Sequence, residues 1–279
     1  MKKLFLAILS LCLIFCAASC DKKEKDTSTF SGFTASFLNT GKSDCMIIHM
    51  DDIVIMCDTS EQDFEKISSV LKNDGIEKID YMILTHFDKD HIGSAGEIIR
   101  NYEVGTVFAP KAPAKSDEYK KLTEALTLKN MEITYLTADT ELATENGSVR
   151  IFAPFEENYD DDNAYSLITE VKYKNSVMLL TGDATKQRLS EFLSVEPADG
   201  IEVIKLPHHG EYTKSLLALI SRAQPKYGIV TCDASKATVE RKLENTAAQY
   251  DMELLFTFNG DIVFVHDGER FVTAELIDS

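Results

Sequence analysis

The sequence predicts a mixed α/β fold in which helices pack on the outside of two β-sheets. Short apolar and β-branched runs alternate with helical patterns from residue 33 onwards, as expected for strands and helices that share a core. The pattern also begins and ends with segments typical of β-hairpins. The chain has 279 residues, of which 44% are hydrophobic. This length and composition suffice for one large domain with a sizeable core.

The N-terminal half is expected to open with three strands and to continue with alternating helices and strands. The three strands are predicted at residues 33–40, 45–50 and 52–58, because each run is apolar or β-branched and is bounded by turn residues. A helix is predicted at residues 60–76, with Ser60 as its N-cap and Gly75 as its stop. The further elements are a strand ending at Leu84, a helix at 94–102, a strand at 104–110, a helix at 116–128 and a strand at 132–137.

The C-terminal half continues the same alternation. Its predicted elements are a strand at 149–154, an acidic loop at 155–166, a hairpin of 167–174 with 177–183, a helix at 184–193, a strand in 201–210, a helix at 213–223, a strand at 227–232 and a helix at 236–250. Asn259-Gly260 is a strong two-residue turn pattern. The chain is therefore expected to close with a β-hairpin across these two residues, and the domain is placed at residues 33–279.

The first 32 residues are expected to lie outside this domain. Residues 1–19 have two lysines before an apolar run, which predicts an export signal peptide. The following Ala17-Ala18-Ser19-Cys20 resembles the lipobox of bacterial lipoproteins, in which the cysteine is lipidated. Residues 20–32 are charged and rich in Ser and Thr, as in a solvated tether. We therefore expect an exported protein that is anchored through lipid on Cys20 to the outer face of the bacterial cell membrane; a plain secretory signal cut near Ala18 is the alternative.

The charge of the chain limits the kinds of substrate that its surface can attract. The formal net charge is −17 at pH 7, which disfavours a basic surface that binds nucleic acid by neutralising phosphates. A site in which metal cations supply the positive charge locally remains compatible with this value.

Ionisable residues are concentrated where a predicted strand ends, in the sequence ILTHFDKDHIG at residues 83–93. Four ionisable residues follow the strand within six positions: His86, Asp88, Asp90 and His91. These residues cannot share one helical face, but an irregular turn after the strand can direct all four into one pocket. Imidazole nitrogens and carboxylate oxygens together suit Zn, Mn or Fe.

Two further strand ends carry similar groups. Asp183 ends a strand in Thr-Gly-Asp, and His208 and His209 follow another strand in Pro-His-His-Gly. Each piece has an ordinary structural explanation: Asp183 as the N-cap of the next helix, and the two histidines as an exposed corner. Their joint occurrence favours a metal site, because loops at one edge of a sheet bring together groups that are distant in sequence.

The order of these motifs resembles the metallo-β-lactamase superfamily, and in detail the metallo-hydrolase domain of the competence protein ComEC family. Besides the histidine and aspartate motifs, residues 37–60 resemble the opening hairpin of that family, which ends in Asp58-Thr59, and Asn163 and Ser166 resemble its Asn-x-x-Ser strand. The resemblance covers about residues 33–265. It implies an αββα four-layer sandwich with one or two divalent ions, Zn or Mn, at one edge.

The resemblance also implies roles for individual residues. His86 and Asp88 would lie toward one ion, whereas Asp90, His91 and one histidine of the pair His208 and His209 would lie toward the other. Asp183 would bridge them. Asp90 is alternatively expected to orient a bound water, and the histidine that holds no metal is expected to return a proton to the leaving group. Asp90, His208 and His209 are thus the candidate catalytic residues.

This chain departs from the family pattern in three places. Asp88 stands where the superfamily commonly has histidine, and Asn163 stands where many members have another histidine, which makes the first site rich in oxygen. After residue 232 the ComEC-type loop with Gly-His-Pro is absent, and the chain has DASKATVERKL instead. The substrate pocket of this chain is therefore expected to differ from that of the family.

The leading hypothesis from the sequence is an extracytoplasmic metal-dependent hydrolase of phosphodiesters, with DNA as the substrate that the family suggests. Two alternatives remain: a hydrolase of a small or cell-wall phosphoester, and a catalytically weak, metal-binding surface lipoprotein. A β-lactamase is less favoured. No protein partner is inferred from the sequence.

Overall fold

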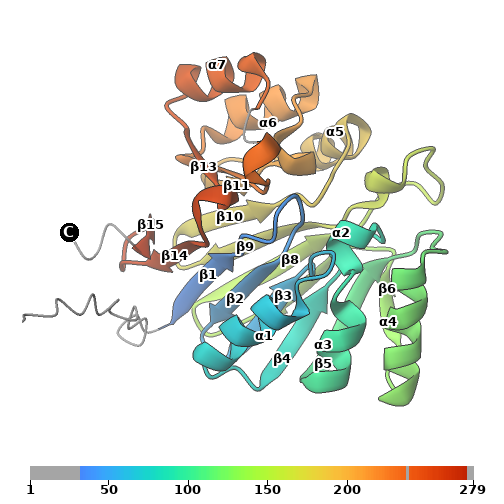
Figure 1. Cartoon of the computed structure of the whole chain (residues 1–279). Helices are drawn as coiled ribbons and strands as arrows, with labels where there is room; N and C mark the ends of the chain where they lie inside the picture. Colours follow the sequence, from blue (N-terminus) through green and yellow to red (C-terminus); the bar gives the residue numbers. More distant parts are fainter. Residues whose placement is uncertain (1–31, 237–238, 275–279) are drawn as a thin grey trace, which may run out of the picture.

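The computed structural model describes residues 32–236 and 239–274. The predicted signal peptide at 1–19, Cys20 and the tether as far as residue 31 lie outside the described residues. Two β-sheets lie face to face in the middle of the molecule, and helices cover the outer face of each sheet (Figure 1). This arrangement confirms the mixed α/β class and the predicted αββα sandwich. Within the described ranges, no helix combines the length and apolar character needed to cross a bilayer.

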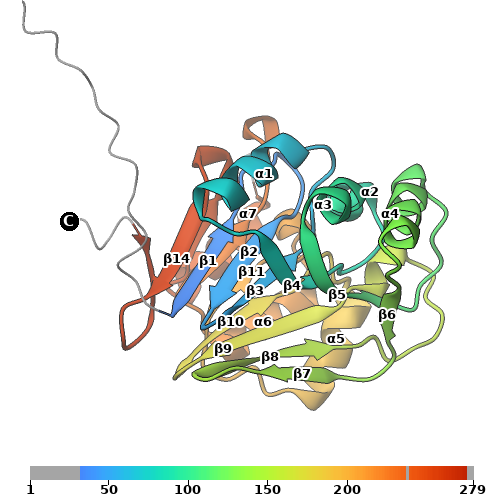
Figure 2. The same cartoon turned by 90° about the horizontal axis from the view of Figure 1, so that it is seen from below.

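The larger sheet has eight strands. In spatial order they are β15 (Phe271–Thr273), β14 (Ile262–His266), β1 (Phe33–Phe37), β2 (Met46–Met50), β3 (Ile53–Cys57), β4 (Lys78–Ile83), β5 (Glu103–Pro110) and β6 (Ile133–Leu136). The first three strands in the chain pair antiparallel, as predicted. From β3 to β6 the strands run parallel, and such strands need crossover connections. The helices α1 (Phe64–Asn73), α3 (Ala95–Asn101) and α4 (Asp117–Leu128) supply these connections and cover the outer face (Figure 2).

The smaller sheet has seven strands. In spatial order they are β13 (Glu253–Phe256), β12 (Tyr227–Val230), β11 (Ile201–Lys205), β10 (Ser176–Leu180), β9 (Ile168–Tyr173), β8 (Gly147–Phe152) and β7 (Thr140–Ala143). The predicted hairpin of β9 and β10 is confirmed. The helices α5 (Lys186–Val195), α6 (Lys214–Ala223) and α7 (Arg241–Gln249) lie on the outer face of this sheet (Figure 1).

Three hydrophobic cores separate the four layers. The central core joins side chains of both sheets, including Phe37, Ile55, Val171, Met178 and Phe264. A second core lies between the larger sheet and α1, α3 and α4, and a third lies between the smaller sheet and α5 to α7. Apolar burial on both faces of each sheet explains why the central strands are almost continuous apolar runs.

The predicted terminal hairpin across Asn259-Gly260 is wrong. β13 pairs parallel with β12 in the smaller sheet, whereas β14 pairs antiparallel with β1 in the larger sheet. Residues Thr257–Asn259 form a 3-10 turn, and Gly260 has a φ of 141°. The Asn-Gly turn therefore carries the chain from one sheet to the other. The hairpin that closes the fold is instead β14 with β15.

Other element boundaries also differ from the predictions. The first helix begins at Phe64 rather than near Ser60, because Ser60 has a φ of 61° and its hydroxyl donates to the Asp63 carboxylate. The short edge strand β7 was not predicted, since its sequence TELA has only four residues and lacks alternation of apolar and polar residues. The last helix begins at Arg241, five residues later than the pattern indicated.

A buried arginine fixes the loop that joins β8 to β9. Arg188 of α5 is fully buried and donates through Nε to the Ser166 carbonyl, 2.9 Å away, and through Nη2 to the carbonyls of Phe152 and Ala153. A buried guanidinium requires such partners. The end of the loop also reaches the other sheet, because the Leu167 amide donates to the Thr85 carbonyl.

Candidate metal centre

The predicted site residues lie where strands of both sheets end. Thr85 and His86 follow β4, Gly182 and Asp183 follow β10, and His209 lies in the turn η3 (Pro207–Gly210) just after β11. β4 is parallel to β3 and β5, and β10 is parallel to β11. Because the carboxyl ends of parallel strands share an edge, and because the two sheets pack face to face, these segments meet at one edge of the sandwich.

Unusual backbone conformations allow the two strand ends to approach closely. Gly182 has a φ of 52°, and a Cβ at this position would lie 2.8 Å from the Cβ of Thr85, so a larger residue would separate the turns. His208 and His209 have φ values of 46° and 54°. Each such non-glycine residue costs about 1–3 kcal/mol and is typical of functional sites. The strained turn directs the two histidine side chains differently.

The Asp183 carboxylate lies at the centre of the cluster. Its Oδ2 is 3.4 Å from His91 Nε2 and 3.4 Å from His209 Nε2. Asp90 Oδ2 lies 3.5 Å from the same His209 Nε2. Donor atoms of His86, His91 and Asp183 lie within 4.8 Å of one another, and Asp90, His91 and His209 form a second such group. The two groups share His91, so they lie next to each other, although His91 Nε2 can coordinate only one ion.

Hydrogen bonds outside the cluster determine which imidazole nitrogen faces inward. The buried Asp58 lies with Oδ2 2.7 Å from His91 Nδ1 and also accepts from the Thr85 hydroxyl. Because the Thr85 proton is donated to Asp58, the Thr85 oxygen accepts from His86 Nδ1, which is 3.1 Å away. Both imidazoles therefore donate through Nδ1 and turn Nε2 toward the cluster, the usual outer arrangement of metal-bound histidines.

The donor set fits a divalent transition-metal ion. The Nε2 atoms of His86, His91 and His209 are buried and have no hydrogen-bond partner in the part of the chain that the structure describes. Such unsatisfied polar atoms are rare in protein interiors, and coordination to a cation would satisfy all three. Imidazole nitrogens with carboxylate oxygens are ligands of Zn, Mn and Fe.

A third group of donors, Asp44, Asp58 and His91, is also compact. Its carboxylates are already engaged, Asp58 by Thr85 and His91, and Asp44 by Lys205. The ammonium group of Lys205 already supplies a cation there, so this group does not fit a metal ion.

The electrostatics of the cluster favour bound positive charge. Burial alone would lower the pKa of the His91 imidazole, but the carboxylates of Asp183 and Asp58 raise this pKa well above its ordinary value. Burial alone would raise the pKa of Asp183, yet His91 and Lys205 hold it well below the usual range. The carboxylates therefore stay ionised, and either a proton on His91 or a divalent cation in its place compensates their charge.

Two predicted residues, His208 and Asp88, lie at the margin of the cluster. The side chain of His208 is 36% exposed; its Nε2 is 4.0 Å from Asp183 Oδ2, and its Nδ1 is 2.7 Å from the Glu211 carboxylate. The side chain of Asp88 is 47% exposed and lies 3.6 Å from His86 Nε2. Asn163 has a buried Oδ1 that finds no hydrogen-bond partner among the described residues. The geometry thus brings His209, rather than His208, into the donor groups.

Sequence reasoning missed three buried residues that contact the cluster: Asp44, Lys205 and Thr231. The lysine carried a recognisable pattern, because it stands in the apolar strand sequence IEVIK, where every neighbour is apolar except Glu202. Asp44 and Thr231 offered no comparable pattern. Asp44 and Thr231 are 187 positions apart in the sequence, and their role becomes clear only from the hydrogen bond between them in the structure.

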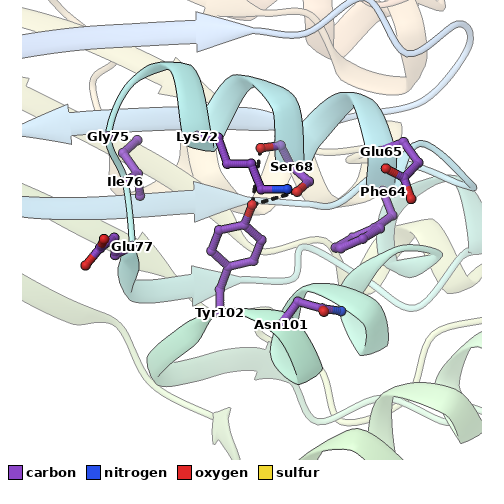
Figure 3. Close-up of a pocket in the computed structure, with 9 residues that line it drawn as sticks. All are labelled: Phe64, Glu65, Ser68, Lys72, Gly75, Ile76, Glu77, Asn101 and Tyr102. Atoms are coloured by element: carbon purple, nitrogen blue, oxygen red, sulfur yellow. Dashed lines mark hydrogen bonds between the residues drawn. The ribbon is translucent and has the colours of Figure 1, made fainter.

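A polar hollow of about 530 Å³ opens beside Asp90. The lining residues come from three loops and the short helix α2 (Lys89–Ile92): Thr40, Lys42, Ser43, Glu61, Gln62, Asp63, Lys89, Asp90 and Asp233. Another hollow of about 500 Å³ lies between α1 and α3, where the Tyr102 hydroxyl meets Ser68 (Figure 3). None of the residues lining the second hollow belongs to the donor groups. The hollow beside Asp90 is therefore the candidate substrate pocket.

Comparison with known families agrees with this geometry. The family model described as "Metallo-beta-lactamase superfamily" matches residues 39–232. The chain belongs to this superfamily. Among curated proteins, the chain is 27% identical over 157 residues to ComE operon protein 3 of Bacillus subtilis. It is also 25% identical over 166 residues to Recombination protein 2 of Haemophilus influenzae. The matches cover 56% and 60% of this chain but only 20% and 19% of those proteins.

Solved structures show the same superfamily fold. The metallo-β-lactamase fold protein YhfI from Bacillus subtilis aligns with a TM-score of 0.56 at 8% identity, over 80% of this chain and 96% of its own. Igni18, a metallo hydrolase from the archaeon Ignicoccus hospitalis, aligns with a TM-score of 0.53 at 15% identity, over 84% of this chain and 100% of its own. At these identities the likeness shows the fold alone. The predicted superfamily is confirmed by the family model that matches residues 39–232.

Proposed function

We propose that this chain is a metal-dependent hydrolase of phosphodiesters. The observation that carries the proposal is the convergence of three buried, unpartnered imidazole Nε2 atoms with the carboxylates of Asp90 and Asp183 at one edge of the sandwich. One divalent ion would be held by Asp90, His91, His209 and Asp183. His86, Asp183 and Asp88 would hold the other, which is richer in oxygen ligands and so favours Mn.

The residues around the cluster fit hydrolysis. A divalent ion bound here supplies Lewis acidity and lowers the pKa of a bound water from 15.7 to about 7. Asp183 is held so that one carboxylate oxygen faces both groups of donors. His208 stands at the rim, and its Nδ1 contacts the Glu211 carboxylate. The imidazolium form of His208 would therefore be needed for Nε2 to donate a proton to a leaving oxygen.

Two observations favour a phosphoryl substrate. Two lysines, Lys42 and Lys89, line the hollow beside Asp90. Lys89 pairs with Glu61, whereas Lys42 forms no ion pair with the described residues and can contact a substrate. A phosphoryl group gains most from neighbouring cations, because the charge on its oxygens must be neutralised before a nucleophile can approach. The similarity to ComE operon protein 3 and Recombination protein 2 supports nucleic acid as the wider substrate class.

Short or small diesters fit this chain better than long DNA. Five exposed carboxylates stand in the loop before Asn163: Glu156, Glu157, Asp160, Asp161 and Asp162. This loop ends next to the metal centre, because the Leu167 amide donates to the Thr85 carbonyl. The loop would repel a polyanion over roughly one Debye length, about 8–10 Å at moderate salt. This charge also supports the alternative of a small or cell-wall phosphoester as the natural substrate.

The substrate class is tested by comparing bis(p-nitrophenyl) phosphate, single-stranded DNA and a chromogenic cephalosporin with protein loaded with Mn or Zn. We expect turnover of the small diester to exceed that of the cephalosporin, and Mn to be the more effective ion. DNA should be cleaved more slowly than the small diester, because the acidic loop slows encounter. Faster turnover of the cephalosporin than of the diester would contradict the proposal.

We further propose that the protein is exported and anchored through lipid on Cys20, as the lipobox-like sequence indicates. Each buried CH₂ of an acyl chain contributes about 0.8 kcal/mol to membrane binding, so several chains hold a protein firmly. A clickable fatty acid supplied to cells that express the full chain should label the wild type and not Cys20→Ala. Equal labelling of both proteins would contradict this anchor.

A further inference from the structure

A buried lysine and a buried aspartate form an ion pair behind the metal centre. Lys205 of β11 and Asp44, in the loop before β2, are both fully buried, and the Lys205 ammonium contacts Asp44 Oδ2. The ammonium also donates to the Gly182 carbonyl, 2.9 Å away, and lies 3.4 Å from Asp183 Oδ1. Two oxygens of the Thr-Gly-Asp turn are therefore held from behind by one cation.

The same aspartate reaches a histidine of the cluster through a threonine. Asp44 Oδ1 accepts from the buried Thr231 hydroxyl at 2.7 Å, and the Thr231 oxygen lies 2.9 Å from His209 Nδ1. A hydroxyl has a single proton, and an ionised carboxylate can only accept. The Thr231 proton is therefore donated to Asp44, and the Thr231 oxygen accepts from His209 Nδ1. This leaves Nε2 of His209 as the nitrogen with a free lone pair, facing Asp90 and Asp183.

This arrangement repeats the one found around Asp58. There, one carboxylate and the Thr85 hydroxyl orient His91 and His86. Here, Asp44 and Thr231 orient His209. A buried ion pair is weak evidence for stability, because apolar residues of similar volume often stabilise a protein as well or better. The placement of this pair against two candidate ligands points to a role in the site.

We propose that Asp44, Thr231 and Lys205 are positioning residues that prepare His209 and Asp183 to hold a divalent ion. Asp44 and Thr231 keep the proton of His209 on Nδ1, and Lys205 occupies Asp183 Oδ1 so that Oδ2 is the oxygen presented to the cluster. This inference rests on the proposed function, because it requires that the donor groups hold metal. It adds three residues that contribute no ligand atom.

The experiment uses Thr231→Val, which removes the hydroxyl and keeps the shape of the side chain, and Thr231→Ser, which restores the hydroxyl. Metal-free protein is titrated with Mn and, separately, Zn by calorimetry, and bound metal is counted by elemental analysis. We expect Thr231→Val to weaken one of the bound ions by about 10–100-fold, the usual effect of losing an outer partner of a ligand. Thr231→Ser should bind both ions as the wild type does.

A matched control separates positioning from general damage to the fold. Thr246→Val removes another buried threonine hydroxyl, which donates only to the Lys242 carbonyl within α7. It should leave metal binding unchanged. Wild-type affinity in Thr231→Val, or an equal loss of both ions together with a lower melting temperature of the metal-free protein, would overturn the inference while the proposed function stands. A wild type that binds no Mn or Zn would overturn the proposed function, and this inference with it.

Discussion

Replacing His91 by alanine is expected to lower kcat/KM for bis(p-nitrophenyl) phosphate by at least about 100-fold, because loss of an outer partner alone typically costs 10–100-fold and His91 is a candidate ligand itself. His91 is fully buried and contributes donor atoms to both groups that fit a metal ion. Its removal also leaves Asp58 without the imidazole that lies 2.7 Å from Oδ2. His86 and His209 cannot replace the lost nitrogen, since each is itself a candidate ligand in the donor groups.

The measurement compares steady-state rates of metal-loaded wild type, His91→Ala and His49→Ala. His49 is an exposed histidine of β2 in the larger sheet. Its replacement therefore controls for the loss of an imidazole outside the cluster. Thermal melting of the metal-free proteins shows whether His91→Ala still folds. A folded His91→Ala that hydrolyses the diester at the wild-type rate would exclude this cluster as the site of the reaction.

Much of the fold could be predicted from local patterns, because its central strands are buried on both faces and its helices carry one apolar side. The failures occur where a distant partner decides the outcome. Asn259-Gly260 has the local preference of a hairpin turn, but its flanking strands pair with β12 and β1 in different sheets. The edge strand β7 is held by pairing with β8, and its four residues lack the alternation that would predict a strand.

The same distinction applies to the site. His86, His91, Asp183 and His209 could be predicted as a set, because each follows an apolar strand and strand ends of parallel sheets converge. The sequence could not decide between His208 and His209, since the choice depends on two consecutive left-handed backbone conformations. The contacts behind the cluster could not be predicted, because they join distant segments through single side-chain atoms. The Thr231 hydroxyl, for example, joins Asp44 to His209.

Asp183→Asn is expected to reduce metal binding far more than Asp88→Asn. The Asp183 side chain is almost fully buried, and its Oδ2 lies 3.4 Å from both His91 Nε2 and His209 Nε2, so one atom faces both candidate ion positions. Asp88 is half-exposed, and among the described residues it forms an ion pair with His86. An asparagine at position 183 removes the negative charge that two neighbouring cations require between them. At position 88, solvent water can replace the lost oxygen ligand.

Both variants are refolded or dialysed with Mn and with Zn, and bound metal per chain is measured by elemental analysis and calorimetric titration. Asp183→Asn should weaken every bound ion by more than about 100-fold, whereas Asp88→Asn should weaken one ion by about tenfold and leave the other unchanged, because a ligand shared by two ions matters to both. Asp183→Asn also leaves Lys205 facing an uncharged amide, so the melting temperature of each metal-free variant is compared with that of the wild type. Equal losses in the two variants, or a greater loss in Asp88→Asn, would show that Asp183 does not bridge the two positions.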